Sequence, residues 1–131
     1  MTIGQWRFDQ EGIDWQELSI LFRIAPLADK SAEHLRLVFG NSQFKCFVLD
    51  AGKLVGAGRA LADGRDCCYL CDIVVHPDYQ GRGLGKAVVA QLTALCAGHS
   101  KIILYENPGK EGFYRKCGFP PDADRHGLVS G

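Results

Sequence analysis

The chain reads DIVVHPDYQGRGLGK from Asp72 to Lys86. Apolar residues precede His76, glycines crowd the turn that follows, and apolar residues recur at helical spacing from Leu84, so the stretch predicts a strand, a glycine-rich turn and an amphipathic helix. Glycine permits positive φ angles in such a turn, and the unpaired N–H groups of a first helical turn favour a negatively charged ligand. We expect an anion site that fits a diphosphate. An ordinary strand-to-helix turn is the alternative interpretation.

Two common phosphate motifs do not fit these glycines. A P-loop needs Gly, four residues and then Gly-Lys-Ser/Thr, but Gln80 stands at the first glycine and Ala87 follows Lys86. A dinucleotide fingerprint needs Gly-x-Gly-x-x-Gly, and Lys86 or Val88 stands at the third glycine. Nucleoside triphosphates and NAD are therefore disfavoured.

The rest of the chain alternates between strand and helix patterns. Asp14 with Glu17 three residues later predicts a capping box at one helix start, and Ser31 predicts a second start. The predicted strands are Ile3–Asp9, Phe44–Leu49, Lys53–Leu61, Cys67–His76 and Lys101–Tyr105, and the predicted helices are Asp14–Ala25, Ser31–Phe39, Gly81–Ala97 and Gly109–Lys116. The order β-α-α-β-β-β-α-β-α predicts an α/β domain with a mixed central sheet and helices on both faces.

Length and charge exclude several classes of protein. The 131 residues fit one domain, and 47% apolar residues suffice for a core without metal or disulfide staples. Fifteen Lys plus Arg balance fifteen Asp plus Glu, so neither nucleic acid nor an anionic membrane is an expected partner. The apolar runs are far shorter than the roughly 20 residues of a membrane span, and the first residues lack a secretory pattern. We expect a cytoplasmic protein.

The cysteines bear on redox compartment and metal binding. Six are present: Cys46, Cys67, Cys68, Cys71, Cys96 and Cys117. They could form three disulfides, but a reducing cytosol and an adequate core favour buried free thiols. The Cys68-x-x-Cys71 pair offers two ligands where structural zinc needs four, and side chains three apart in a strand point to opposite faces. No metal is expected.

The spacing that does fit is Gln-x-x-Gly-x-Gly, from Gln80 to Gly85. Farther on, Asn107 is followed seven residues later by Tyr114, within GFYRKCGF. These patterns, over about Cys67 to Phe119, resemble the GNAT N-acetyltransferase superfamily, and the upstream β-α-α-β-β order is similar to the family fold. The chain looks closest to small bacterial and plastid members of the serotonin or arylalkylamine type.

The resemblance implies acetyl-CoA as acetyl donor and a small primary amine as acceptor. In the family, the strand equivalent to Ile73–Val75 splays away from the next parallel strand, so its backbone pairs with the pantetheine amides, while the N–H groups of Gly81 to Lys86 hold the pyrophosphate. The implied cofactor-binding residues are Ile73, Val74, Val75, Gln80, Gly81, Arg82, Gly83, Leu84, Gly85, Lys86 and Asn107.

Acetyl transfer to an amine needs a neutral nucleophile, stabilisation of the thioester oxygen and a proton for the departing thiolate. The resemblance assigns the leaving-group acid to Tyr114, with a tyrosine packed at a helix start as the alternative. A backbone N–H of Val74 or Val75 would stabilise the oxygen. Asp72, just before the pantetheine-binding strand, is the candidate base, directly or through water. His76 is expected to be a turn residue.

The end of the chain departs from the family pattern, in which a last apolar strand follows Phe119. Here Pro120 and Pro121 remove two ladder donors, and Leu128–Val129 is a short apolar pair. We expect a domain over residues 1–119, a frayed tail over 120–131 and no final strand. Either a partner chain, as in a homodimer, covers the edge near Lys101–Tyr105, or the fold is less stable and acceptor recognition is altered.

Two other functions compete with a small-molecule N-acetyltransferase. One is a non-catalytic acetyl-CoA-binding regulator, and the other is acetylation of a protein amine, for which no acidic groove pattern is present. In the family, the helices equivalent to Asp14–Phe39 wall the acceptor side. Trp15, Phe22 and Phe39 then predict an uncharged aromatic slot that prefers tryptamine to spermidine, unless these rings simply pack the helices on the sheet.

Overall fold

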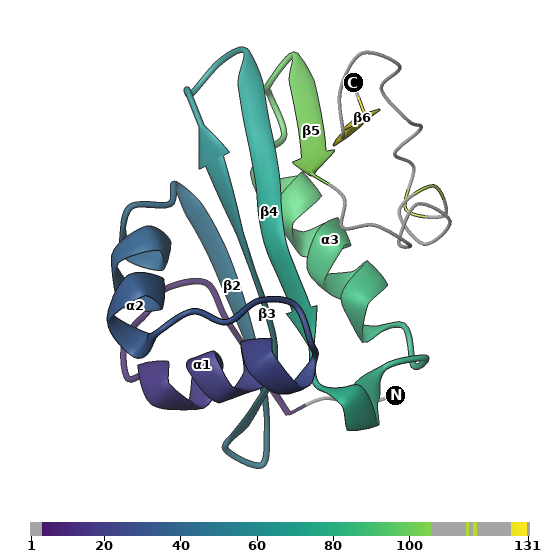
Figure 1. The fold of residues 1–131 in the computed structure, drawn as a ribbon. Helices are drawn as coiled ribbons and strands as arrows, with labels where there is room; N and C mark the ends of the chain where they lie inside the picture. The colour runs from purple at the N-terminus through teal and green to yellow at the C-terminus, as the bar shows by residue number, and fades with distance from the viewer. Residues whose placement is uncertain (1–3, 106–114, 116, 118–126, 131) are drawn as a thin grey trace.

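The computed structural model describes residues 4–105, 115, 117 and 127–130. Its elements are β1 (Gln5–Arg7), α1 (Trp15–Ile24), α2 (Ala32–Gly40), β2 (Phe44–Asp50), β3 (Lys53–Ala62), β4 (Cys67–Val75), the 3-10 turn η1 (Pro77–Tyr79), α3 (Leu84–Leu95), β5 (Lys101–Tyr105) and β6 (Gly127–Ser130) (Figure 1). The strands form one sheet in the order β1-β2-β3-β4-β5-β6. Only the β4–β5 pair among these is parallel, which confirms the predicted mixed sheet.

Helices cover both faces of the sheet (Figure 1). On one face, Phe22 of α1 and Phe39 of α2 are buried with Phe47 of β2 in one apolar cluster. On the other face, Val88 and Leu92 of α3 belong to a second cluster that includes strand residues of β2, β3 and β4. Burial of apolar side chains on both faces stabilises the sheet, which makes it a rigid support for the site.

The helix starts follow the predicted capping residues. Asp14 Oδ1 accepts from the backbone N–H groups of Gln16 and Glu17, at 3.0 and 3.2 Å. Glu17 Oε2 accepts from the backbone N–H of Leu54 in β3 at 2.9 Å. The predicted capping box is therefore half correct. Asp14 caps the helix as predicted, but the Glu17 side chain bonds to β3 and so ties α1 to the sheet.

The final strand is present, so the expectation that it is missing was wrong. β6 runs antiparallel to β5, with Val129 opposite Ile103 and Leu128 opposite Leu104. A strand of four residues needs few ladder bonds, and the two prolines precede it in the chain without interrupting it. β5 is thus paired on both sides, and no partner chain is needed to cover it. Residues 120–126, and the helix predicted over 109–116 except Arg115, lie outside the described residues.

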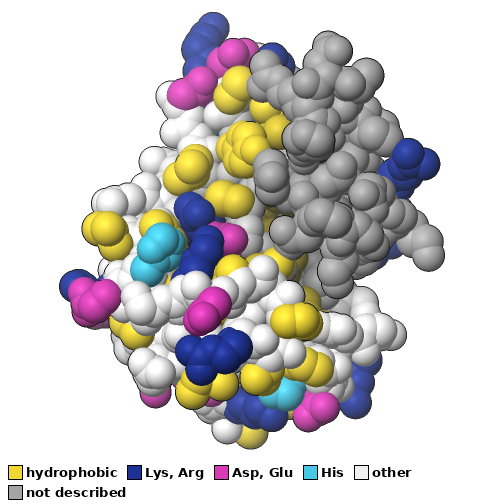
Figure 2. Space-filling model, viewed as in Figure 1, with side chains coloured by type: hydrophobic (Ala, Val, Ile, Leu, Met, Phe, Trp, Pro, Cys, Tyr) yellow, Lys and Arg dark blue, Asp and Glu magenta, His cyan; other side chains and the backbone are white. Residues whose placement is uncertain are grey.

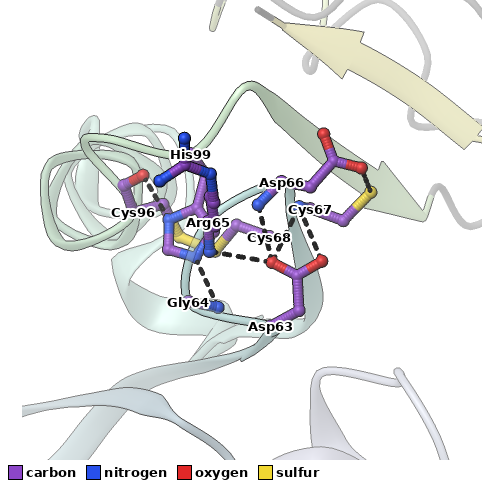
Figure 3. The surroundings of a disulfide bond; sticks show 8 residues. All are labelled: Asp63, Gly64, Arg65, Asp66, Cys67, Cys68, Cys96 and His99. Atoms are coloured by element: carbon purple, nitrogen blue, oxygen red, sulfur yellow. Dashed lines mark hydrogen bonds between the residues drawn. A yellow bond between two sulfur atoms is a disulfide. The ribbon is translucent and has the colours of Figure 1, made fainter.

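Two cysteines form a disulfide, so the expectation of free thiols was wrong for them. Cys68 of β4 bonds to Cys96, which follows α3, with the two Cα atoms 6.1 Å apart (Figure 3). The argument from redox compartment could not foresee which cysteines the fold brings together. The prediction of buried free thiols is correct for Cys46, whereas Cys67, Cys71 and Cys117 are free but only partly buried. Burial raises the pKa of the Cys46 thiol to about 12, which makes it a poor nucleophile.

A hairpin turn beside the disulfide holds Asp63, Asp66 and Cys67, whose ligand-type atoms lie within 4.8 Å of one another. Asp63 Oδ1 accepts from the backbone N–H groups of Arg65, Asp66 and Cys67 at 2.9, 2.7 and 3.1 Å (Figure 3). The hydrogen bonds from the N–H groups of Arg65 and Asp66 are the largest causes of the lowered pKa of Asp63. The carboxylate therefore closes the β3–β4 turn, a structural role.

Candidate functional site

β5 accompanies β4 along only the first part of β4. The register runs from Cys67 opposite Lys101 to Leu70 opposite Leu104, whereas β4 continues to Val75. On its other edge β4 stays paired with β3 as far as Val75. Within the described residues, the edge of β4 beyond Leu70 therefore has no strand partner. Its main-chain groups can bind an extended chain of amides as a further strand would.

The free edge begins at a β-bulge. Ala57 of β3 pairs with Val74 and Arg59 pairs with Cys71, so Asp72 and the residue after it stand opposite Gly58 alone. Asp72 has a φ of 58°, in the left-handed region. A bulge adds a residue to one strand and bends it, so this bulge lies where β4 loses its parallel neighbour.

Beyond the bulge, the orientation of the backbone decides which N–H and C=O groups of β4 face β3 and which face the free edge. The N–H of His76 donates to the carbonyl of Val55 in β3 at 2.8 Å. Because these orientations alternate along an antiparallel strand, the N–H and C=O of Val75 point to the free edge and those of Val74 point to β3. Gln80 Nε2 donates to the carbonyl of Val75 at 3.0 Å, which leaves the N–H of Val75 as the available donor there.

The glycine-rich turn has the predicted conformation. Gly81 and Gly83 have φ angles of 79° and 82°, and a Cβ built on either would meet nothing within 4 Å. Glycine is thus required for the backbone conformation, and open space adjoins both residues. Gly83 is the N-cap of α3, and no side chain accepts a hydrogen bond at this cap. The N–H groups of the first turn, from the buried Leu84 onward, are therefore suited to a negatively charged ligand.

Side chains around the turn are fixed by local contacts. His76 Nδ1 accepts from the backbone N–H of Asp78 at 3.1 Å, which confirms its role as a turn residue. The Tyr79 hydroxyl donates to Asp50 at 2.5 Å, and this hydrogen bond is the largest cause of the raised pKa of Tyr79. The Arg82 guanidinium lies 5.4 Å from the Tyr79 ring centre. Arg82 and Lys86 are exposed, so both cations remain open to an anion.

Asp72 is bound by two cations. Arg59 Nε donates to Oδ2 at 2.7 Å, and Lys30 Nζ lies 3.5 Å from Oδ1. The exposed fractions of the side chains are 13% for Arg59, 14% for Asp72 and 26% for Lys30. Arg59 also donates to Ser42 Oγ at 3.3 Å, and its guanidinium lies 6.0 Å from the Phe39 ring centre.

This cluster of Asp72, Arg59 and Lys30 lies on the sheet face that carries α1 and α2. Figure 2 shows Lys or Arg side chains beside Asp or Glu side chains in the middle of that face. Sequence reasoning missed both cations. Arg59 had a signal, because it is a charged residue within the apolar strand KLVGAGRALA. Lys30 had none, because it lies between the helices and reaches the sheet only in the folded chain.

The aromatic residues predicted to line an acceptor slot belong to the core. Phe22 and Phe39 are completely buried. The Trp15 ring centre lies 6.1 Å from those of Phe39 and Phe47. The alternative interpretation is therefore correct, and these rings pack the helices on the sheet. Two further predicted site residues, Asn107 and Tyr114, lie outside the described residues.

The model of the acetyltransferase (GNAT) family matches residues 11–119. The chain therefore belongs to the GNAT acetyltransferase family. A serotonin N-acetyltransferase 2, chloroplastic, from Oryza sativa subsp. japonica is 35% identical over 124 residues, which are 90% of this chain and 62% of the relative. A GCN5-related N-acetyltransferase 1, chloroplastic, from Arabidopsis thaliana is 42% identical over 118 residues, 87% of this chain and 60% of that protein.

Solved structures support the same fold. A protein of unknown function from meticillin-resistant Staphylococcus aureus, described as a probable acetyltransferase, has a TM-score of 0.81 at 23% identity, covering 92% of this chain and 93% of that one. A GNAT family acetyltransferase from Streptococcus pneumoniae has a TM-score of 0.71 at 24% identity, covering 88% and 87%. Among the curated relatives, the chain spans 42% of an N-acetyltransferase ycf52 from Pyropia yezoensis and 62% of the rice protein.

Proposed function

We propose that the chain transfers the acetyl group of acetyl-CoA to a small primary amine. One observation carries the proposal: the free edge of β4 after Leu70 leads through two positive-φ glycines to the uncapped start of α3. An extended amide chain ending in a diphosphate, as in coenzyme A, has the chemistry that both parts of this surface can bind. Family membership supports the acetyl donor.

The residues fit this donor without metal. The N–H groups from Gly81 to Lys86 would hold the diphosphate, with Arg82 and Lys86 adding positive charge. The main-chain groups of Ile73 at the free edge would pair with a pantetheine amide, and Asn107 would bind the same arm from its other side. The open space beside Gly81 and Gly83 supports a ligand in close contact with the backbone.

The chemistry follows the needs of thioester aminolysis. The N–H of Val75 is the donor proposed to stabilise the developing negative charge on the acetyl oxygen. Tyr114 is proposed to give its proton to the departing thiolate. Asp72 is proposed to take the proton of the amine through Oδ1, because the 3.5 Å contact of that oxygen with Lys30 is the looser of its two ion pairs.

The acceptor is proposed to be a monoamine. The name of the rice relative, a serotonin N-acetyltransferase, supports an arylalkylamine. A second reason is charge, since Lys30 and Arg59 outnumber Asp72 within their cluster and so oppose a polycation. Tryptamine is therefore expected to have a higher kcat/KM than spermidine.

The cytoplasm remains the proposed location, with the plastid as the alternative that the chloroplastic relatives suggest. None of the helices in the described residues is long and apolar enough to cross a membrane. A homodimer remains a prediction.

Thiol release from acetyl-CoA tests the proposal, measured over arylalkylamines, polyamines, amino sugars and peptide N-termini. Amine-dependent release with identification of the N-acetylated product supports an N-acetyltransferase. Binding of acetyl-CoA without release to any amine would indicate the regulatory alternative. Release confined to peptides would overturn the small-molecule acceptor but retain the reaction.

A further inference from the structure

The loop between α1 and α2 places a lysine against the proposed base. The carbonyl of Lys30 accepts from Ser19 Oγ of α1 at 2.6 Å, so the backbone of the loop is fixed to the helix. From there the side chain reaches β4, where Nζ lies 3.5 Å from Oδ1 of Asp72. A primary amine of the chain itself therefore occupies a position at the bulge of β4.

The two cations on Asp72 are not equivalent. Arg59 is held by Asp72 at 2.7 Å, by Ser42 and by the ring of Phe39, and its side chain is 13% exposed. Within the described part of the chain, the Lys30 ammonium has a single ion pair, at 3.5 Å, and its side chain is twice as exposed, at 26%. Arg59 thus stabilises the carboxylate, while Lys30 can leave it at little cost.

The position of Asp72 brings this amine near the proposed reaction centre. Asp72 directly precedes Ile73, the first residue that is proposed to pair with the pantetheine arm along the free edge. In the proposed mechanism, the acceptor amine gives its proton to Asp72. An amine that is already bound to Asp72 therefore has the same partner as the acceptor. Lys30 Nζ therefore has the position that the proposed mechanism gives to the ammonium group of a substrate.

We propose that Lys30 is an intramolecular acetyl acceptor, so that the chain acetylates itself at this residue. The proposal rests on the proposed function. Asp72 takes a proton from the Lys30 ammonium, and the neutral nitrogen forms a bond to the acetyl carbon as the carbon–sulfur bond breaks. The sulfur leaves with the electron pair of that bond and takes a proton from Tyr114. The nitrogen loses a second proton as the amide forms, which restores the Tyr114 phenol, and Asp72 releases its proton to solvent. The products are Nε-acetyl-Lys30 and free coenzyme A.

Lys45 is a matched control within the same chain. It pairs across β2 and β3 with Arg59, so it lies on the same sheet face, and it is also partly buried. Lys45 lies farther from the bulge, because β3, which carries Arg59, lies between β2 and β4 in the sheet. Chemical acetylation by the thioester in solution should therefore act on both lysines, whereas catalysis should act on Lys30.

The experiment incubates the full chain with acetyl-CoA and follows the acetylation of each lysine by peptide mass spectrometry. Acetylation of Lys30 is expected to be at least about tenfold faster than that of Lys45, because an oriented intramolecular amine has a high effective concentration. Its first-order rate constant should not change on tenfold dilution of the protein. Asp72→Asn should reduce the rate at Lys30 by about tenfold or more, and Lys45→Arg should leave it unchanged.

Binding is measured beside the mass spectra. Lys30→Arg keeps the positive charge, so acetyl-CoA should raise its Tm as it does for the unchanged chain. Equal rates at Lys30 and Lys45, or a rate constant that rises with protein concentration, would overturn the inference. If amines release thiol while Lys30 stays unmodified, the inference fails and the proposed function stands. If no amine releases thiol and Lys30 stays unmodified, both the inference and the proposed function fail.

Discussion

Arg59 Nε donates to Asp72 Oδ2 at 2.7 Å across the bulge that starts the free edge of β4. Asp72 carries a φ of 58°, an unfavourable angle for a residue with a side chain, and the ion pair compensates for the strain. The arginine therefore holds the bulge in place from the neighbouring strand. Loss of this contact should affect both folding and the site.

Replacement of Arg59 by Met should lower the free energy of unfolding by about 2–4 kcal/mol, because a mostly buried carboxylate loses its main partner. Urea denaturation measures the change. Arg59→Met/Asp72→Asn should recover part of the loss, since the charge is then removed as well. If the double variant is as unstable as the sum of the single variants, the two residues are not coupled.

Gly58 permits the close approach of α3 and the bulge. A Cβ there would lie 2.8 Å from Leu92 Cδ1 and 2.9 Å from both Ile73 Cδ1 and Val88 Cγ1. Gly58→Ala should therefore destabilise the chain by about 1–3 kcal/mol through overpacking. Gly56→Ala is the matched control in the same strand, because its Cβ would meet its nearest atom at an ordinary 3.4 Å. Similar thermal stability of the two variants would contradict this account.

The element order was predictable because periodicity and turn residues are local signals. Asp14 and Ser31 mark helix starts in the sequence and cap those helices in the structure. The strand, glycine turn and helix from β4 to α3 were likewise predicted. β6 was missed because its pattern is only a few residues long, and a strand of that length gains most of its stability from pairing with β5.

The site was only partly predictable, because its charged cluster joins residues that are distant in sequence. Asp72 could be chosen from its place beside the glycine motif, but Lys30 is 42 residues away. The Cys68–Cys96 bond spans a separation of 28 residues for the same reason. Tertiary contacts of this kind have no periodic signal.

Gly83 tests the proposed diphosphate site. Acetyl-CoA at 100 times its Kd should stabilise the unchanged chain by about 2.7 kcal/mol, seen as a rise in Tm. Gly83→Asp should abolish the rise, since it adds negative charge beside the N–H groups of α3. Gly64→Asp is the control for backbone strain, because Gly64 also has a positive φ of 89° and an open Cβ position but lies in the β3–β4 turn. Equal ligand-induced shifts in both variants would refute the assignment.

Tyr114→Phe tests the proposed leaving-group acid. The variant should lower kcat by about 10–10³-fold, because only the departing thiolate needs this proton. The rise in Tm caused by acetyl-CoA should persist, since the phenol is not assigned to donor binding. Turnover should be measured where chemistry limits the rate, with a thiol-release assay. Unchanged kcat under those conditions would exclude Tyr114 as the acid.

The Cys68–Cys96 disulfide ties β4, which carries the free edge, to the end of α3, whose start carries the proposed anion site. Closing a 28-residue separation should contribute about 3–4 kcal/mol through the entropy of the unfolded chain. Dithiothreitol should therefore lower the Tm, and Cys68→Ala should lower it without further effect of the reductant. Cys67→Ser is the neighbouring control and should keep the sensitivity. Titration of the unreduced, denatured chain with a thiol reagent should find the four free cysteines, and six reactive thiols would show that the bond does not form.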